Sequence, residues 1–201
     1  MRKIFVSGIG TDVGKTVVSA ILCKGLRADY WKPIQSGDFA PTDRERVQLL
    51  LPETKTHKEQ WLLKKPVSPH EAAALENIRI NLQELIIPET KNTLIIEGAG
   101  GLMVPLNDEE LIIDMIIKTD AEVVLVSSNY LGSINHTLLS AEVLRSRGIK
   151  VTGIIFNGSE NNATEEAIQN FSGLPVLGRI GKEVKIDQQV IEKYANRFTG
   201  I

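Results

Sequence analysis

The sequence predicts a three-layer α/β fold, in which a mostly parallel sheet is flanked by helices on both faces. Short apolar runs alternate with segments of helical period, a pattern typical of buried parallel strands joined by right-handed helical crossovers. We expect strands at residues 3–7, 93–97, 122–127, 151–156 and 175–178, with a weaker strand at 29–33. We expect helices at residues 17–26, 108–118, 134–147, 163–171 and 188–197.

Local signals set several of these boundaries. Pro33 ends the weak strand, Ser133 is expected to cap the helix that begins at Ile134, and Gly148 stops that helix. Residues 36–92 are rich in proline, threonine and charge, with short helical patterns only at 44–51 and 70–76. We interpret this region as an elaborated crossover that carries site loops, so residues 1–201 are expected to form a single domain.

A glycine-rich turn joins the first strand to the first helix. It runs from Gly8 to Gly14, Lys15 and Thr16, and five residues separate the two glycines where the common pattern has four. Backbone N–H groups of such a turn converge on an anion, the lysine faces the β- and γ-phosphates, and the threonine hydroxyl can bind Mg²⁺. The helix that follows adds its dipole to the anion site. The sequence therefore predicts a phosphate-binding loop and a fold like that of the phosphate-loop NTPases.

Polar residues also follow the other expected strands, and ligands bind beyond the carboxyl ends of parallel strands. Glu97 ends an apolar strand, where a carboxylate is costly unless it is paired or bound to metal. With Thr16 it could hold Mg²⁺ against the phosphates. Lys32 follows the weak strand and is a candidate second cation for phosphoryl or carboxylate oxygens.

Composition narrows the class of protein. The 201 residues are 42% hydrophobic, which suits a folded α/β domain, and the formal net charge is −2 without a long basic block. We therefore expect no nucleic acid partner. No apolar run reaches the roughly 18–20 residues of a membrane span, so we expect no membrane partner and a cytoplasmic location. The lone cysteine, Cys23, cannot form an intrachain disulfide.

Five segments, in order, resemble the dethiobiotin synthetase family. They are Gly8-Ile9-Gly10-Thr11-Asp12-Val13-Gly14-Lys15-Thr16, Lys32-Pro33-Ile34-Gln35-Ser36-Gly37, Ser68-Pro69-His70-Glu71-Ala72-Ala73, Glu97-Gly98-Ala99-Gly100-Gly101 and Leu131-Gly132-Ser133-Ile134-Asn135-His136. They lie within residues 1–158. The first and fourth are shared in part with related amidoligases and partitioning-type ATPases, whereas the others are more restrictive. The chain departs from the family at Gly181, where the family often has proline, which leaves the adenine pocket undefined.

The resemblance implies that 7,8-diaminononanoate, CO₂ and MgATP react to dethiobiotin, ADP and phosphate, through a carbamate and a carbamic–phosphoric anhydride. It implies catalytic roles for Lys15, Lys32, Thr11 and Ser36. It places the nucleotide along Asp12, Val13, Gly14, Lys15, Thr16, Val17, Asp43, Glu97, Gly98, Ala99, Gly100 and Asn157, with Asn157 reading adenine. Thr16, Asp43 and Glu97 match the family's Mg²⁺ contacts; Asp43 is aligned only by its order and by the helix after it.

The resemblance also implies a homodimer with shared active sites. The carboxylate at the remote end of the substrate would lie on Ser133, Ile134 and Asn135, whose helix N-terminus one subunit donates to the other, while Ser36 contacts the reacting end. His70 and His136 have no metal-ligand partners in the sequence and are expected to make structural hydrogen bonds.

Two other functions stay open from the sequence. One is a related ATP-dependent amidoligase, although the chain has no region of glutaminase size to supply ammonia. The other is a nucleotide-switch ATPase of the partitioning type, which acts through partners. Those proteins commonly carry an additional early lysine in the loop, where this chain has Ile9 and Gly10.

Overall fold

The apolar runs of the sequence assemble into one parallel sheet. The computed structural model describes residues 1–37 and 40–201, and in this part of the chain seven strands pair in the order β4-β2-β6-β1-β7-β8-β9, with every pairing parallel. The strands are β1 (Lys3–Gly8), β2 (Asp29–Trp31), β4 (Thr56–His57), β6 (Leu94–Glu97), β7 (Glu122–Ser128), β8 (Val151–Asn157) and β9 (Val176–Ile180). The predicted parallel sheet is confirmed.

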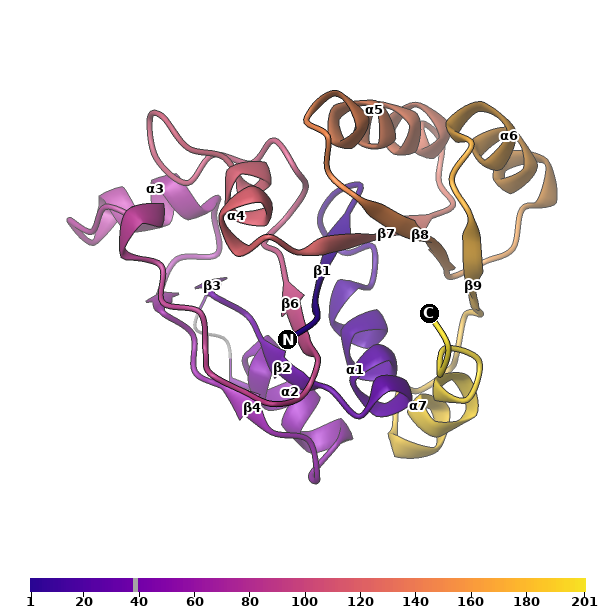
Figure 1. Cartoon of the computed structure of the whole chain (residues 1–201), viewed down its shortest axis with the longest axis horizontal. Coiled ribbons are helices and arrows are strands. Elements are labelled where there is room, and N and C mark those ends of the chain that lie inside the picture. The colour runs from indigo at the N-terminus through magenta and orange to yellow at the C-terminus, as the bar shows by residue number, and fades with distance from the viewer. Residues whose placement is uncertain (38–39) are drawn as a thin grey trace.

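Helices cover both faces of this sheet, as predicted (Figure 1). They are α1 (Lys15–Leu26), α2 (Asp43–Leu50), α3 (Pro69–Leu75), α4 (Ile112–Thr119), α5 (Ser133–Ser146), α6 (Asn162–Ser172) and α7 (Gln188–Ala195). Helices α2 and α7 both pack against α1 on one face, and α4 and α5 lie on the other face with α6 beside α5. A short 3-10 helix, η1 (Leu82–Glu84), packs against α4.

The sheet separates two apolar cores, because successive side chains of a strand point to opposite faces. Ile4, Val6 and Ile95 belong to the core beneath α1 and α7, whereas Phe5 and Ile96 belong to the core beneath α4. Glu97 follows this alternation and points to the same face as Ile95. The last residue of β6 is therefore aimed at the N-terminal end of α1.

Several details differ from the sequence-based predictions. Helix α4 begins at Ile112 instead of residue 108, because the residues before it form a tight turn in which the Leu106 N–H donates to the Glu110 carbonyl at 2.8 Å. Ser133 is not a cap: it is the first residue of α5, and Gly132 is the N-cap in a left-handed conformation. A separate two-stranded sheet, β3 (Ile34–Ser36) with β5 (Trp61–Leu63), and the two-residue strand β4 were not predicted.

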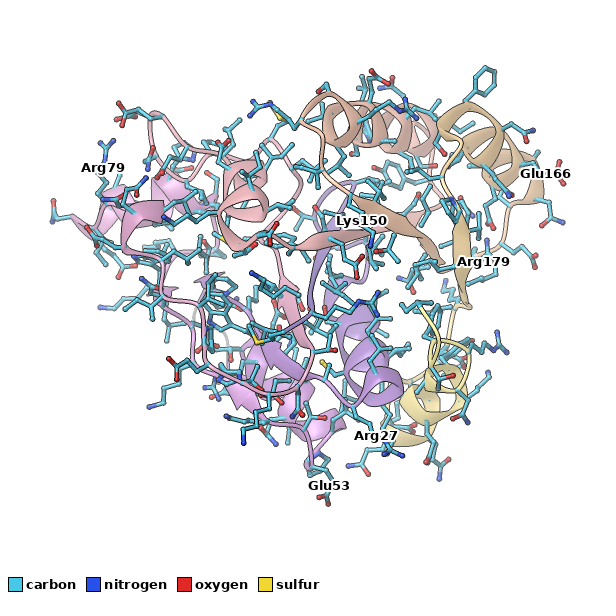
Figure 2. All side chains as sticks on the ribbon, in the orientation of Figure 1. Arg27, Glu53, Arg79, Lys150, Glu166 and Arg179 are labelled. Atoms are coloured by element: carbon cyan, nitrogen blue, oxygen red, sulfur yellow. The ribbon has the colours of Figure 1, made fainter. Side chains whose placement is uncertain are left out.

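Charged side chains of both signs project from the rim of the molecule. Figure 2 shows this for Arg27, Glu53, Arg79 and Glu166, which are all exposed. Within residues 1–37 and 40–201, no helix has the length and apolar character needed to cross a membrane.

Candidate active site

The strand order brings the predicted site residues together. Strand β6 lies between β2 and β1, with Trp31 level with Ile96 and Val6 level with Glu97. Lys32, Glu97 and the loop after β1 therefore meet at the carboxyl edge of the sheet, where they border a cavity of about 720 Å³. Its lining comprises Thr11, Asp12, Gly14, Lys15, Thr16, Val17, Lys32, Gln35, Ser36, Asp43, Arg46, Pro66, Val67, Ser68, Pro69, Glu97, Ala99, Gly100 and Val104.

The loop after β1 is anchored from below by β8. The Asn157 side-chain amide donates to the Val13 carbonyl at 2.9 Å, and Val13 itself is buried. Gly14 lies directly over Asn157 in a left-handed conformation (φ 95°), and a Cβ atom there would be 2.1 Å from Asn157 Nδ2. Asn157 thus supports the loop through a contact within the protein and does not line the cavity. Gly98 lies beside the cavity-lining Ala99 and donates its N–H to the Val6 carbonyl at 3.1 Å.

Lys15 opens α1 and is almost completely buried under the loop. Its Nζ donates to the Gly10 carbonyl at 2.8 Å. Burial lowers the pKa of Lys15 to about 8, helped by repulsion from Lys32, although the nearby Glu97 and Asp43 act in the opposite direction. Because the neighbouring groups of the protein do not compensate for its burial, this ammonium is suited to binding an anion such as a phosphate.

Lys32 bridges two carboxylates at the centre of the site. Its Nζ is 2.9 Å from Glu97 Oε1 and also pairs with Asp43. Burial alone would lower the pKa of Lys32, but Glu97 and Asp43 outweigh it and the pKa is raised. Burial would likewise raise the pKa of Asp43, yet the Lys32 ammonium keeps it below its ordinary value. Both directions favour the charged forms of Lys32 and Asp43.

Glu97 is buried, and both of its carboxylate oxygens accept hydrogen bonds. Oε1 accepts from the Thr16 hydroxyl at 2.9 Å as well as from Lys32, and Oε2 accepts from the Tyr30 hydroxyl at 2.9 Å. Burial and the neighbouring Glu97 charge raise the pKa of Tyr30 well above its usual value, so the phenol remains a donor. The sequence predicts that this carboxylate at the end of a strand needs a partner, and in the structure it has three: Thr16, Lys32 and Tyr30.

The start of α2 delivers Asp43 to this cluster. Thr42 precedes it in a capping box with Glu45, where each residue accepts a hydrogen bond from the other's backbone N–H. The Asp43 N–H donates to the side-chain oxygen of Gln35 at 3.4 Å. The sequence aligns Asp43 only by its order and by the helix after it, and in the structure Asp43 lies against Lys32.

The donor set at this point fits Mg²⁺. Thr16, Asp43 and Glu97 offer only oxygen atoms, which Mg²⁺ prefers, and Mg²⁺ is usually held by one or two carboxylates together with waters and substrate phosphates. Among the described residues, no group of three or more His, Cys, Asp or Glu side chains could hold a metal ion.

The Ser36 hydroxyl is buried and has no hydrogen-bond partner among the described residues. It belongs to a residue that lines the cavity, so a bound ligand could supply the missing partner. Thr11 lines the same cavity from the phosphate-loop side.

Ser133, Ile134 and Asn135 are not brought to this cavity. Ser133 is buried, and its N–H donates to the Tyr130 carbonyl at 3.0 Å. Ile134 and Asn135 are exposed and line a second cavity, also of about 720 Å³, at the N-terminal end of α5. A hydrogen bond of the expected structural kind joins His136 Nδ1 and the Tyr130 hydroxyl at 2.7 Å.

Four parts of the site were missed from the sequence. Tyr30 looks like an ordinary core aromatic residue of its strand, and nothing local marks its hydroxyl as a site group. Arg46 lines the cavity without belonging to any local motif, and Gln35 lines it from within the Lys32–Gly37 segment, where no role was predicted for it. Residues 66–69 also line it, and the Ser68-Pro69-His70 segment was the available signal for this stretch.

Comparisons with known proteins find similar sequences along most of the chain. The family model described as "AAA domain" matches residues 2–190. The ATP-dependent dethiobiotin synthetase BioD of Christiangramia forsetii is 50% identical, over 98% of this chain and 96% of the relative. BioD of Cytophaga hutchinsonii is 49% identical, over 97% and 96%.

A solved structure supports the fold alone. The septum site-determining protein MinD of Pyrococcus horikoshii, complexed with Mg-ADP, has a TM-score of 0.59 at 18% identity, over 98% of this chain and 91% of the other. Because sequence relatives with half of their residues identical match almost from end to end, the chain belongs to the family of ATP-dependent dethiobiotin synthetases.

Proposed function

We propose that this protein is an ATP-dependent ligase that converts 7,8-diaminononanoate, CO₂ and MgATP into dethiobiotin, ADP and phosphate, the penultimate step of biotin synthesis, in the cytoplasm. One observation carries the proposal: Lys15, Lys32 and Ser36, whose hydroxyl has no partner within residues 1–37 and 40–201, line the same cavity at the phosphate loop. Lysine ammonium groups and hydrogen-bond donors surround the cavity, and a reaction that passes through anionic species requires such groups.

The chemistry proceeds in three steps. One substrate amine adds to CO₂ and loses a proton, giving a carbamate. A carbamate oxygen then attacks the γ-phosphorus and ADP leaves, giving a carbamic–phosphoric anhydride. The second amine attacks the carbonyl carbon, closes the cyclic urea and expels phosphate. No step needs a nucleophile from the protein, so the contribution of the protein is to position the reactants and neutralise charge.

Each cation has a separate task in this scheme. Lys15, under the loop, binds the β- and γ-phosphates. Lys32 faces the carbamate and the phosphoryl group in transfer, and Thr11 and Ser36 donate hydrogen bonds at that end. Thr16, Asp43 and Glu97 would hold Mg²⁺, which neutralises phosphate charge when bound. Asp12 and residues 97–100 border the triphosphate. Asn157 supports the loop and contacts the adenine beside it.

We further propose a homodimer in which each subunit completes the site of the other. The substrate carries a carboxylate at its remote end, and two of the residues expected to bind it, Ile134 and Asn135, line the second cavity of the same chain. Leu131, Ile134 and Leu139 are exposed around the start of α5, an apolar surface that a second subunit could cover.

The proposal is tested by substrate dependence. Purified protein should hydrolyse ATP to ADP only when diaminononanoate and bicarbonate are both present, and mass spectrometry should detect dethiobiotin. Lys15→Ala should reduce the rate by at least roughly 10²-fold, whereas Lys91→Ala, at an exposed lysine outside the cavity, should not. ATP turnover stimulated instead by DNA or a protein would support the nucleotide switch, and ammonia-dependent amide formation would support an amidoligase.

A further inference from the structure

Tyr30 places a polar group where an apolar one would suffice. It is fully buried in the core beneath α1, and its backbone lies on β2 beside Ile95 of β6. Within the described residues its hydroxyl has one hydrogen-bond partner, Glu97 Oε2 at 2.9 Å. A phenol buried this way costs free energy unless its hydroxyl is satisfied, and phenylalanine would fill the same space without that requirement. The contact with Glu97 is therefore what distinguishes tyrosine here.

The carboxylate of Glu97 needs such a contact to keep its orientation. The terminal torsion of a glutamate side chain is soft, so the carboxylate plane turns easily unless both oxygens are held. Thr16 and Lys32 hold Oε1 on the cavity side, and Tyr30 holds Oε2 on the core side. With the far oxygen fixed, Oε1 faces the Thr16 hydroxyl and the cavity.

We propose that Tyr30 is a positioning residue, which fixes the Glu97 carboxylate so that Oε1 is presented to a divalent cation beside Thr16. This inference rests on the proposed function, in which Glu97 is a Mg²⁺ ligand. Groups that hydrogen-bond to a metal ligand orient it, and their removal commonly weakens metal affinity or activity by about 10–100-fold.

The test measures binding without turnover. Calorimetry gives the affinity for a non-hydrolysable ATP analogue with Mg²⁺ and again in EDTA, and the ratio is the enhancement due to the metal. Tyr30→Phe should lower this enhancement about 10-fold and leave the affinity in EDTA unchanged. The matched control is Thr119→Val, which also removes a fully buried hydroxyl but lies at the end of α4. It should leave both affinities unchanged, so a general loss of stability cannot mimic the effect.

Glu97→Gln separates failure of this inference from failure of the proposed function. If Tyr30→Phe alone lowers the enhancement but adds nothing once Glu97→Gln has lowered it, Tyr30 acts through Glu97. If Glu97→Gln abolishes it while Tyr30→Phe alone has no effect, the positioning role is wrong and the metal-ligand role stands. If Glu97→Gln has no effect, the ligand assignment fails and the inference fails with it.

A second measurement uses the unaltered protein, in case Tyr30→Phe does not fold. The chain has three tyrosines, so ¹³C label at the ring carbon bearing the hydroxyl gives three resonances. Tyr130→Phe and Tyr194→Phe assign two of them. Adding Mg²⁺ to the complex with the ATP analogue should shift the Tyr30 resonance, because its acceptor changes charge environment. A Tyr30 resonance that does not move would overturn the inference.

Discussion

The charged Lys15 side chain destabilises the folded protein, because it is buried under the phosphate loop. Burial lowers its pKa from 10.5 to about 8, which corresponds to roughly 3 kcal/mol against the charged form. Its hydrogen bond to the Gly10 carbonyl offsets only about 1 kcal/mol of this. The cost is consistent with a residue whose position serves ligand binding instead of folding.

Replacing Lys15 with methionine should therefore raise the free energy of unfolding by about 2 kcal/mol at pH 7. Below pH 8 both folded and unfolded chains carry the lysine proton, so the cost is fully present. Between pH 8 and 10.5 the unfolded chain binds more protons, so wild-type stability rises with pH and the advantage of the variant disappears. Urea unfolding across this pH range measures the difference in the free energy of unfolding between variant and wild type. The control is Lys24→Met, at an exposed position of α1. A variant less stable than wild type at pH 7 would contradict the burial argument.

Lys32 is bound differently, because the buried carboxylate of Glu97 and the half-buried carboxylate of Asp43 both pair with it. Lys32→Gln leaves Glu97 and Asp43 without their cation, so unfolding in EDTA should become easier by about 3 kcal/mol. With substrates, kcat should fall by at least about 10²-fold while ATP affinity changes little, as for an interaction that strengthens in the transition state.

Arg44→Gln is the matched control for Lys32. Arg44 also pairs with a buried carboxylate, Glu59 at 3.0 Å, but lies outside the cavity. It should lower stability and leave kcat unchanged. If calorimetry on Lys32→Gln showed ATP binding lost in proportion to activity, Lys32 would be a ground-state contact and its assigned role would be wrong.

Among the elements, the phosphate loop depends on a strand more than 140 residues away. Gly14 has no room for a side chain because Asn157 of β8 lies directly beneath it. The loop shape is therefore set jointly by its own glycines and by β8.

Gly14→Ala should destabilise the protein by at least about 2 kcal/mol, from the left-handed backbone and the displaced Asn157 side chain. It should also weaken ATP binding. Gly10→Ala is the control in the same loop, since a Cβ atom there meets nothing within 4 Å, and its thermal unfolding should match wild type. Equal stability of the two variants would show that Asn157 does not constrain the loop.

At the scale of the whole molecule, the proposed shared site predicts complementation between inactive subunits. Ser133 is buried, so a bulky residue there would disturb the subunit itself; Asn135 is exposed and lines the second cavity. We expect Lys15→Ala and Asn135→Trp to be inactive alone and to recover up to about a quarter of wild-type activity when mixed equally and exchanged, since half of the dimers then hold one intact site.

The reciprocal mixture provides the control. In an equal mixture of wild type and a chain carrying both substitutions, activity is half of the full value before exchange. After exchange it should fall to about a quarter if sites are shared, and should stay at half if each site lies within one chain. Confirmed exchange without recovery in the first mixture would rule out the shared site.

The sequence by itself determined the local units of this protein. Strand, turn and helix around Lys15 are encoded within a few residues by apolar runs, glycines and a lysine–threonine pair, so β1, the loop and α1 could be predicted, as could the parallel sheet. The family resemblance likewise depends on short contiguous segments. Short strands such as β4 could not be predicted, because two residues carry no periodicity.

Only the tertiary structure decided what surrounds each charged group. Glu97 meets Thr16, Tyr30 and Lys32 across 81, 67 and 65 residues of sequence, because β6 enters the sheet between β2 and β1. Tyr30 could not be distinguished from a core aromatic residue until its hydroxyl was seen beside Glu97. The pKa values of Lys15 and Lys32 move in opposite directions for the same reason. Burial and pairing are properties of the assembled fold, and no local stretch of sequence contains them.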